Sequence, residues 1–253
     1  MKFTPCRTRK LPVGERLHTV RARMLSLRKK VAVRALAGLL VLLSAGFASG
    51  QQAGDKPPGR PGRWSLRNDP MVEVTSVCPT IFVELRYATA RNFTGKQIYP
   101  RRARCLLRRT VAERLCRAQA ELRLRGLGLK IWDAYRPAWA HAMLWKSVPN
   151  PEYVAAPSDG GSWHTWGAAV DVTLVDLEGR EQAMPTDFDD FTDAAKSEYR
   201  GGNPTIAANV KMLRTAMKNA GFRGLRDEWW HFTAENAYQY NLVDLPLEKG
   251  GKY

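Results

Sequence analysis

The sequence predicts a single α+β domain with a mainly antiparallel central sheet flanked by helices. Segments with strand and helix patterns are mixed along the chain without the regular alternation that builds a parallel sheet. The 253 residues are 44% hydrophobic and 9% aromatic. That composition is sufficient to bury a core, and it excludes a disordered, collagen-like or coiled-coil chain.

Four segments have the composition of strands. Residues 72–77 alternate between apolar and polar side chains, which is the period of a half-buried strand. Residues 127–132 and 168–174 are apolar runs typical of buried strands, and Asp171 interrupts the second. Residues 228–233, Glu-Trp-Trp-His-Phe-Thr, complete the set as a last buried strand.

Three segments have helical patterns. In residues 110–125 apolar side chains recur at helical spacing, and we expect Thr110 to cap this helix with Glu113 completing a capping box. Residues 204–220 show the clearest single apolar face, followed by a glycine that ends the helix. Residues 138–146 are predicted as a shorter helix between them.

The first fifty residues resemble an export signal. A basic stretch, residues 1–34, precedes an unbroken apolar run at 35–43 and then small residues. This order predicts a signal peptide over residues 1–50, with Met24 as the start that gives the basic stretch an ordinary length. The apolar run is shorter than the ~20 residues of a membrane span, so a retained anchor is the less favoured alternative. We therefore expect a secreted, periplasmic or cell-envelope protein with no stable membrane insertion after cleavage.

Residues 51–63 are rich in proline and glycine, and they predict a flexible linker before a domain at residues 64–253. The chain's net charge is +16, but residues 1–34 hold 11 of the 40 basic residues and one of the 24 acidic ones. The rest of the chain carries only +6. Because most of the basicity belongs to the signal, no nucleic-acid partner is expected.

Cysteine usage allows one disulfide. Cys6 leaves with the signal, and Cys78, Cys105 and Cys116 remain. In an oxidising compartment three cysteines permit one bridge and one free thiol, with the pairing left open. If Cys105 and Cys116 share one helix, they lie about 16 Å apart and cannot bond.

Two histidines and one buried acid form a candidate metal site. His164 lies in a glycine-rich turn that leads into the strand bearing Asp171, and His231 lies in the last predicted strand. A hydrolytic zinc takes three protein ligands of this type and keeps one position open for water. A carboxylate in an apolar strand is costly unless it is paired or bound to metal. Glu228, three residues before His231, can take a proton from that water without being a ligand.

Each pattern has a simpler explanation when it is taken alone. An isolated His-x6-Asp or Glu-x-x-His arises readily by chance, and Trp229 and Trp230 are core aromatics by composition. His141 has no acidic or glycine neighbours and is predicted to be a packing or surface residue. The joint occurrence of both histidine motifs with the buried acid favours the metal site.

The motifs together resemble a known family. They are Ser162-x-His164-x-x-Gly167-x-Ala169-x-Asp171, Glu228-x-Trp230-His231, Leu85-Arg86-Tyr87-Ala88-Thr89 through Gly95, and Asp133-Ala134-Tyr135-Arg136-Pro137. This set, spread from Val72 to Phe232, is similar to the zinc D-Ala-D-Ala peptidases of the M15 type, and most similar to D-alanyl-D-alanine dipeptidases. The resemblance implies the hedgehog/D,D-peptidase-like fold.

The resemblance also implies the roles of the site residues. It assigns one Zn²⁺ per chain to His164, Asp171 and His231, Glu228 as general base, and Arg136 as the group that stabilises the oxyanion. A guanidinium suits that role because it stays protonated and can hold developing negative charge in a dry pocket. The alternative for Arg136 is a structural ion pair with a nearby acid, Asp133.

The implied substrate is the small dipeptide D-alanyl-D-alanine, hydrolysed to two D-alanines. The family recognises the free ammonium with an acid in a Phe-Asp segment, which matches Asp189 here, although Asp187 or Asp190 could substitute. Tyr87 and Ser162 are weaker candidates for substrate contact. Two tryptophans flanking the first histidine, at positions 163 and 166, depart from the small or polar residues expected there, which puts the width of the substrate in question.

Two alternatives to a dipeptidase stay open at this point. One is a D,D-carboxypeptidase or endopeptidase that acts on peptidoglycan stem peptides, which export mildly favours. The other is a wall-binding module that keeps the zinc fold without catalysis, against which the presence of both Glu228 and Arg136 argues. An exported dipeptidase would meet released wall fragments, so scavenging or turnover is the expected role.

Overall fold

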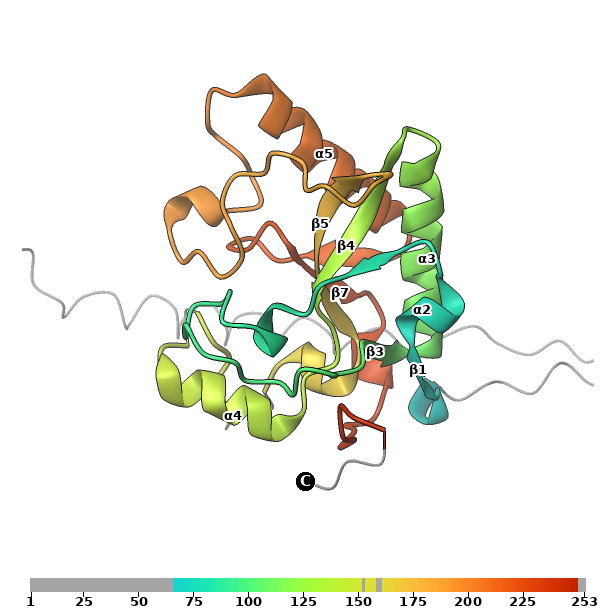
Figure 1. Cartoon of the computed structure of the whole chain (residues 1–253), viewed down its shortest axis with the longest axis vertical. Helices are drawn as coiled ribbons and strands as arrows, with labels where there is room; N and C mark the ends of the chain where they lie inside the picture. Colours follow the sequence, from blue (N-terminus) through green and yellow to red (C-terminus); the bar gives the residue numbers. More distant parts are fainter. Residues whose placement is uncertain (1–65, 152, 158–160, 250–253) are drawn as a thin grey trace, which may run out of the picture. The chain divides into compact units, whose positions relative to one another are not determined.

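The computed structural model describes residues 66–151, 153–157 and 161–249, so the predicted signal peptide and linker lie outside the described residues. A five-stranded sheet in the order β2–β4–β5–β7–β6 is central to this part of the chain (Figure 1). β2 runs parallel to β4, and every other neighbouring pair is antiparallel. The α+β prediction is therefore confirmed. The strands are β2 Phe82–Val83, β4 Leu127–Asp133, β5 Ala169–Asp176, β6 Phe222–Gly224 and β7 His231–Ala234.

The register of the three middle strands brings polar residues into one row. Asp133 at the end of β4 lies opposite Asp171 of β5, after a register shift between Ile131 and Asp133. Asp171 in turn lies opposite His231, the first residue of β7. Residues directly opposite each other in antiparallel strands project to the same face, so these three side chains gather on one side of the sheet.

The helices surround this sheet, and α3 packs against β4 and α5 (Figure 1). The side chains of Val111, Leu115 and Leu122 on one face of α3 are fully buried, as the helical periodicity predicts. A second, two-stranded sheet pairs β1 with β3. The remaining elements are β1 Met71–Glu73, α2 Val74–Val77, β3 Leu106–Arg108, α3 Arg109–Arg123, α4 Ala138–Ser147 and α5 Pro204–Asn219, with the short 3-10 turns η1 Leu66–Asn68, η2 Arg86–Ala88, η4 Trp163–Trp166, η5 Asp193–Ala195 and η6 Ala237–Gln239.

The start of α3 differs from the prediction. No side chain of the helix caps it. Instead, the carboxylate of Asp69, from a distant segment, accepts hydrogen bonds from the Thr110 backbone N–H at 3.0 Å and from its hydroxyl at 2.7 Å. The predicted capping box of Thr110 and Glu113 is wrong because a tertiary contact satisfies this helix end.

Two predicted strands are shorter in the structure. Residues 72–77 divide into β1 and the single turn α2. The last strand begins only at His231, so Glu228 lies in the turn that precedes it. That turn matters for the site, because a residue outside the strand ladder can point into the pocket beside its histidine neighbour.

Cys78, Cys105 and Cys116 are all free thiols in the structure. Cys105 precedes β3 and is not part of α3, so the spacing argument that assumed one shared helix does not apply. Burial raises the pKa of the Cys78 thiol to about 12, with a further contribution from Cys116. Within the described residues, no helix has the length and apolar content needed to cross a bilayer.

Gly167 joins the turn bearing His164 to β5, and its backbone has a φ of +65°. Gly167→Ala should lower the free energy of unfolding by about 1–2 kcal/mol, because an L-residue with a Cβ is disfavoured in this conformation. Gly167→Asn should lower the free energy of unfolding by less, since asparagine tolerates the left-handed region better. Urea unfolding of both variants measures the difference.

Both substitutions place a Cβ 2.7 Å from the end of the flexible Met71 side chain, so that contact cancels in the comparison. Equal decreases in the free energy of unfolding for the alanine and asparagine variants would show that glycine is not needed here for its backbone conformation.

Candidate metal centre and peptidase site

Three side chains from three elements converge on one point. His164 belongs to η4, whose first turn is capped by the Ser162 hydroxyl, which accepts from the His164 backbone N–H at 3.3 Å. Asp171 and His231 come from adjacent positions of β5 and β7. His164 and Asp171 are buried, and His231 is partly buried. The short turn ending at Gly167 lets the chain pass from His164 straight into the strand that carries Asp171.

The ligand atoms of these residues are spaced for a small metal ion. His164 Nε2 lies 3.2 Å from His231 Nδ1 and 3.4 Å from Asp171 Oδ1, and His231 Nδ1 lies 3.0 Å from the same carboxylate oxygen. Ligands bound at about 2.0–2.2 Å around a tetrahedral ion are separated by about 3.3–3.6 Å. The three atoms therefore fit three corners of such a tetrahedron after small adjustments, with the fourth left to the pocket.

Each imidazole is also held at its other nitrogen. His164 Nδ1 lies 2.6 Å from the Ala134 carbonyl, which can only accept, so this nitrogen carries the hydrogen and Nε2 is left with its lone pair. His231 Nε2 lies 3.0 Å from the Thr233 hydroxyl. Such partners fix the tautomer and ring orientation of metal-binding histidines. Burial alone would raise the pKa of Asp171, but the hydrogen bonds and charges of the two histidines outweigh it and hold that pKa well below its ordinary value.

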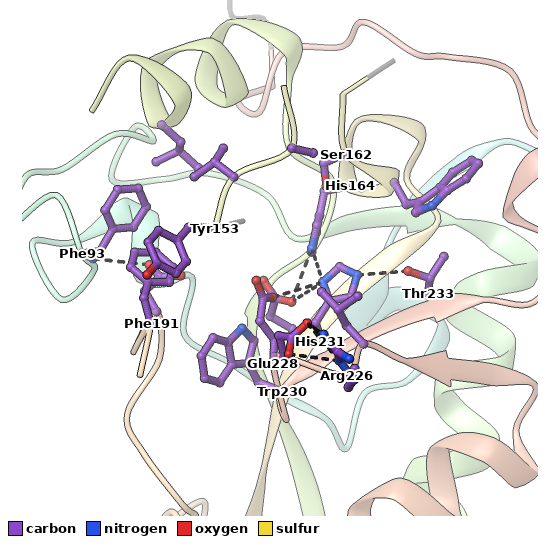
Figure 2. Close-up of a pocket in the computed structure, with 18 of the residues that line it drawn as sticks. Phe93, Tyr153, Ser162, His164, Phe191, Arg226, Glu228, Trp230, His231 and Thr233 are labelled. Carbon is purple, nitrogen blue, oxygen red and sulfur yellow. Dashed lines mark hydrogen bonds and ion pairs between the residues drawn. The ribbon is translucent and has the colours of Figure 1, made fainter. Parts of the chain in front are cut away.

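Glu228 lines the same pocket without belonging to the ligand set (Figure 2). Its Oε2 lies 4.0 Å from His231 Nδ1. Burial raises the pKa of Glu228 to about 7, and the charges of Asp171 and Asp189 act in the same direction while His231 opposes them. A carboxyl with a pKa near neutrality, placed beside a metal position, is suited to accept and return a proton.

Arg136 makes the structural ion pair and also lines the pocket. Its Nε and Nη2 donate to Asp133 Oδ2 at 2.9 and 2.7 Å, so the structural ion pair is present. The Tyr99 hydroxyl donates to the other oxygen of Asp133 at 2.8 Å. Arg136 also lines the pocket, with its guanidinium carbon 5.1 Å from the centre of the Tyr87 ring and Nη2 3.9 Å from Asp171 Oδ2. The ion pair orients the guanidinium without removing it from the site.

Of the three acids considered from the sequence, Asp187, Asp189 and Asp190, only Asp189 lines the pocket. It accepts from the Tyr87 hydroxyl at 3.2 Å and from the Phe93 backbone N–H at 3.4 Å. Burial raises the pKa of Asp189 to about 8, and the charge of Asp171 adds to the effect. Asp187 pairs with Arg86 at 3.5 Å. The last candidate, Asp190, accepts from a backbone N–H in its own turn, so neither alternative acid takes the place of Asp189.

Aromatic side chains that the sequence did not single out lie beside Asp189. The Phe191 ring stacks on Tyr153 with centroids 4.6 Å apart, and it meets Phe93 edge-on at 5.2 Å. These three residues, here called the aromatic wall, group at one side of the pocket, while His164, Glu228 and His231 lie at the other (Figure 2). They come from three separate loops, and although Phe93 lies within the 85–95 motif, no single local pattern groups the three.

The pocket has a volume of about 870 Å³. Trp163 lies in its wall and is 38% exposed, whereas Trp166 packs against Trp163 and the core. Ser162 lines the pocket as well as capping η4. His141 is buried, which agrees with its prediction as a packing residue, and it also lines the pocket, which the sequence did not predict.

Comparison with known proteins agrees with this geometry. Residues 67–246 match the family model for M15 peptidases described as D-Ala-D-Ala dipeptidase. The D-alanyl-D-alanine dipeptidase of Escherichia coli (strain K12) is 38% identical over 173 residues, which cover 68% of this chain and 89% of that protein. That of Enterococcus faecalis is 32% identical over 186 residues, covering 64% of this chain and 86% of that protein. That of Streptomyces coelicolor is 31% identical over 188 residues, covering 65% of this chain and 91% of that protein.

The α+β fold and the pocket thus define a peptidase. The chain belongs to the D-Ala-D-Ala dipeptidase family of M15 peptidases.

His231→Ala should weaken the binding of one divalent ion per chain by at least about 100-fold, because losing even a partner behind a ligand costs 10–100-fold. Competition with a chelating dye measures the affinity. Glu228→Gln should keep the ion, since Glu228 is not one of the three ligands. An unchanged affinity in His231→Ala would remove this residue from the metal centre.

Proposed function

We propose that this protein is a zinc-dependent dipeptidase that hydrolyses D-alanyl-D-alanine to two D-alanines. The observation that carries the proposal is the spacing of His164 Nε2, Asp171 Oδ1 and His231 Nδ1, within a pocket that also holds Glu228 and Asp189. The family match supports dipeptide hydrolysis, and the nitrogen and carboxylate donors suit Zn²⁺.

The ligands would hold zinc through two imidazole nitrogens and one carboxylate oxygen. When bound, the ion lowers the pKa of a water molecule and polarises the scissile carbonyl. Glu228 is placed to take the proton from the attacking water and to return it to the leaving amine. Its raised pKa serves both steps, because a carboxyl near neutrality gains and loses a proton at little cost.

Arg136 stabilises the negative charge that develops on the carbonyl oxygen. Its Nε and Nη2 are directed at Asp133, which fixes the plane of the guanidinium before substrate arrives. A preorganised cation in a buried site contributes more than one exposed to water, because it needs no reorganisation during the reaction. Asp133 in turn is held by the Tyr99 hydroxyl, so the whole group is rigid.

Asp189 recognises the free ammonium of the substrate. A buried carboxylate is costly without a cationic partner, and the raised pKa of Asp189 expresses that cost. A substrate ammonium beside Asp189 would favour the ionised form and satisfy the carboxylate. The aromatic wall lies next to this position, which disfavours a longer N-terminal extension and therefore the alternative of a stem-peptide carboxypeptidase or endopeptidase.

Hydrolysis of D-Ala-D-Ala and of N-acetyl-D-Ala-D-Ala by the zinc-loaded chain tests the proposal. We expect the free dipeptide to be cleaved and the acetylated one to be cleaved at least about tenfold less efficiently, because acetylation removes the ammonium that pairs with Asp189. Equal rates would contradict the amine-recognition argument and favour the stem-peptide alternative.

Glu228→Gln should lower kcat by at least about 100-fold while the metal content stays at one ion per chain, because glutamine keeps the shape but cannot accept the proton. Steady-state kinetics together with metal analysis of the same preparation measure both. Unchanged turnover would remove Glu228 from the mechanism.

Asp189→Asn should lower kcat/KM for the free dipeptide by about 10–100-fold, because it removes a charged partner of the ammonium. Asparagine suits the position, since Asp189 has a φ of +58°. The rate at which the Asp189→Asn variant cleaves the acetylated dipeptide should change little. Asp190→Asn is the matched control, because Asp190 lies one residue away and outside the pocket. The assignment fails if both variants behave alike.

We also propose that the protein acts outside the cytoplasm. The support is the order of basic, apolar and small residues within the first fifty positions. An exported dipeptidase would encounter dipeptides released from the cell wall, which favours scavenging or turnover over depletion of a cytoplasmic precursor.

A further inference from the structure

His141 is a buried polar residue of the pocket that the proposed mechanism does not use. It lies on α4 with only 3% of its surface exposed, and both ring nitrogens have partners. Nε2 lies 2.8 Å from the Ala155 carbonyl, and Nδ1 lies 3.5 Å from Arg136 Nη1. A histidine buried with two defined partners constrains the position of both.

The partners determine the state of the ring. A carbonyl can only accept a hydrogen bond, so Nε2 carries the hydrogen. The guanidinium can only donate, so Nδ1 presents its lone pair to Arg136. Burial and then the Arg136 charge lower the pKa of His141 to about 4, which keeps the ring neutral at physiological pH.

The contact with Arg136 falls on the end of the guanidinium that Asp133 leaves free. Asp133 binds Nε and Nη2, and His141 faces Nη1. His141 therefore adds a contact at the one terminal nitrogen that the Asp133 pair does not engage. The length of the His141 contact leaves Nη1 a weakly bound donor, which a carbonyl oxygen in the pocket can recruit.

The contact with Ala155 joins His141 to a second segment of the pocket lining. Val154 and Ala155 line the pocket, and the neighbouring Tyr153 stacks on Phe191 in the aromatic wall. The hydrogen bond from His141 therefore ties the segment 153–155 to α4. Through it, one side chain connects the arginine at the reacting centre with the wall near the amine position.

We propose that His141 is a positioning residue with two separable functions. Its Nδ1 orients Arg136 toward the reacting carbonyl, and its Nε2–H holds the segment 153–155 that shapes the amine end of the pocket. The inference rests on the proposed function, because it assumes that Arg136 acts on the substrate.

Two substitutions separate the functions. In His141→Gln the amide nitrogen can occupy the place of Nε2 and keep the Ala155 bond, while the acceptor facing Arg136 is lost. In His141→Asn the amide oxygen can occupy the place of Nδ1, while the Ala155 bond is lost. We expect His141→Gln to lower kcat about three- to tenfold with little change in KM, and His141→Asn to raise KM by a similar factor with little change in kcat.

A double-mutant cycle with Arg136→Lys tests whether His141 acts through Arg136. If it does, His141→Gln should have less effect on kcat in the Arg136→Lys chain than in the wild-type chain, because the two residues act as a unit. Met143→Gln, an exposed substitution on the same helix, is the control and should leave both kinetic constants unchanged. Full additivity of His141→Gln and Arg136→Lys, or equal changes in kcat and KM for both His141 variants, would overturn the proposal.

A second readout does not depend on activity. ¹⁵N NMR of the full chain should show a neutral His141 with the hydrogen on Nε2, and the hydrogen on Nδ1 would overturn the proposal. If the wild-type chain cleaves only N-acylated peptides, the proposed function fails. The same comparison of kcat and KM on those peptides then still decides the role of His141.

Discussion

The alignment of β4, β5 and β7 is the constraint on which the site depends. It sets Asp133, Asp171 and His231 side by side in three neighbouring strands, on one face of the sheet. Because side chains alternate between faces along a strand, a slip of one residue would turn Asp171 away from both histidines. The buried apolar residues that surround Asp171 in β5 make such a slip costly, so the packing of the core also fixes the position of this candidate metal ligand.

Charged side chains of both signs line the pocket, and carboxyl groups are concentrated near the candidate metal site. Asp171, Asp189 and Glu228 gather around Arg136, which is itself engaged by Asp133. The pKa values of Glu228 and Asp189 are raised because each is buried near other carboxylates. A divalent ion and a substrate ammonium would supply positive charge from two directions. The raised pKa of Asp189 therefore supports the proposal that this carboxyl pairs with a substrate ammonium.

The sequence predicts the parts of this arrangement that are local and misses those that arise from packing. The strands at Asp171 and His231 and the helix α5 follow from periodicity, and the ligand set follows from motifs with fixed spacing. The start of α3 was predicted incorrectly because Asp69, distant in sequence, satisfies it. The place of His141 in the pocket was not predicted, because its partner Ala155 lies 14 residues away on another segment.

The aromatic wall is the clearest example of a feature that the sequence does not predict. Its three residues, Phe93, Tyr153 and Phe191, lie in loops with no shared sequence pattern. Each is of a residue type that usually packs in a hydrophobic core. Only the fold brings them next to Asp189. The sequence therefore indicates the chemistry of the site, whereas the shape that restricts its substrate requires the three-dimensional structure.

The central claim is that one ion sits among two imidazoles and one aspartate. Anomalous X-ray scattering at the zinc edge, recorded from crystals of the zinc-loaded protein, tests it most directly. The account predicts a single strong peak about 2.0–2.2 Å from His164 Nε2, Asp171 Oδ1 and His231 Nδ1. A peak bound by other residues, or no peak between these three atoms, would contradict it.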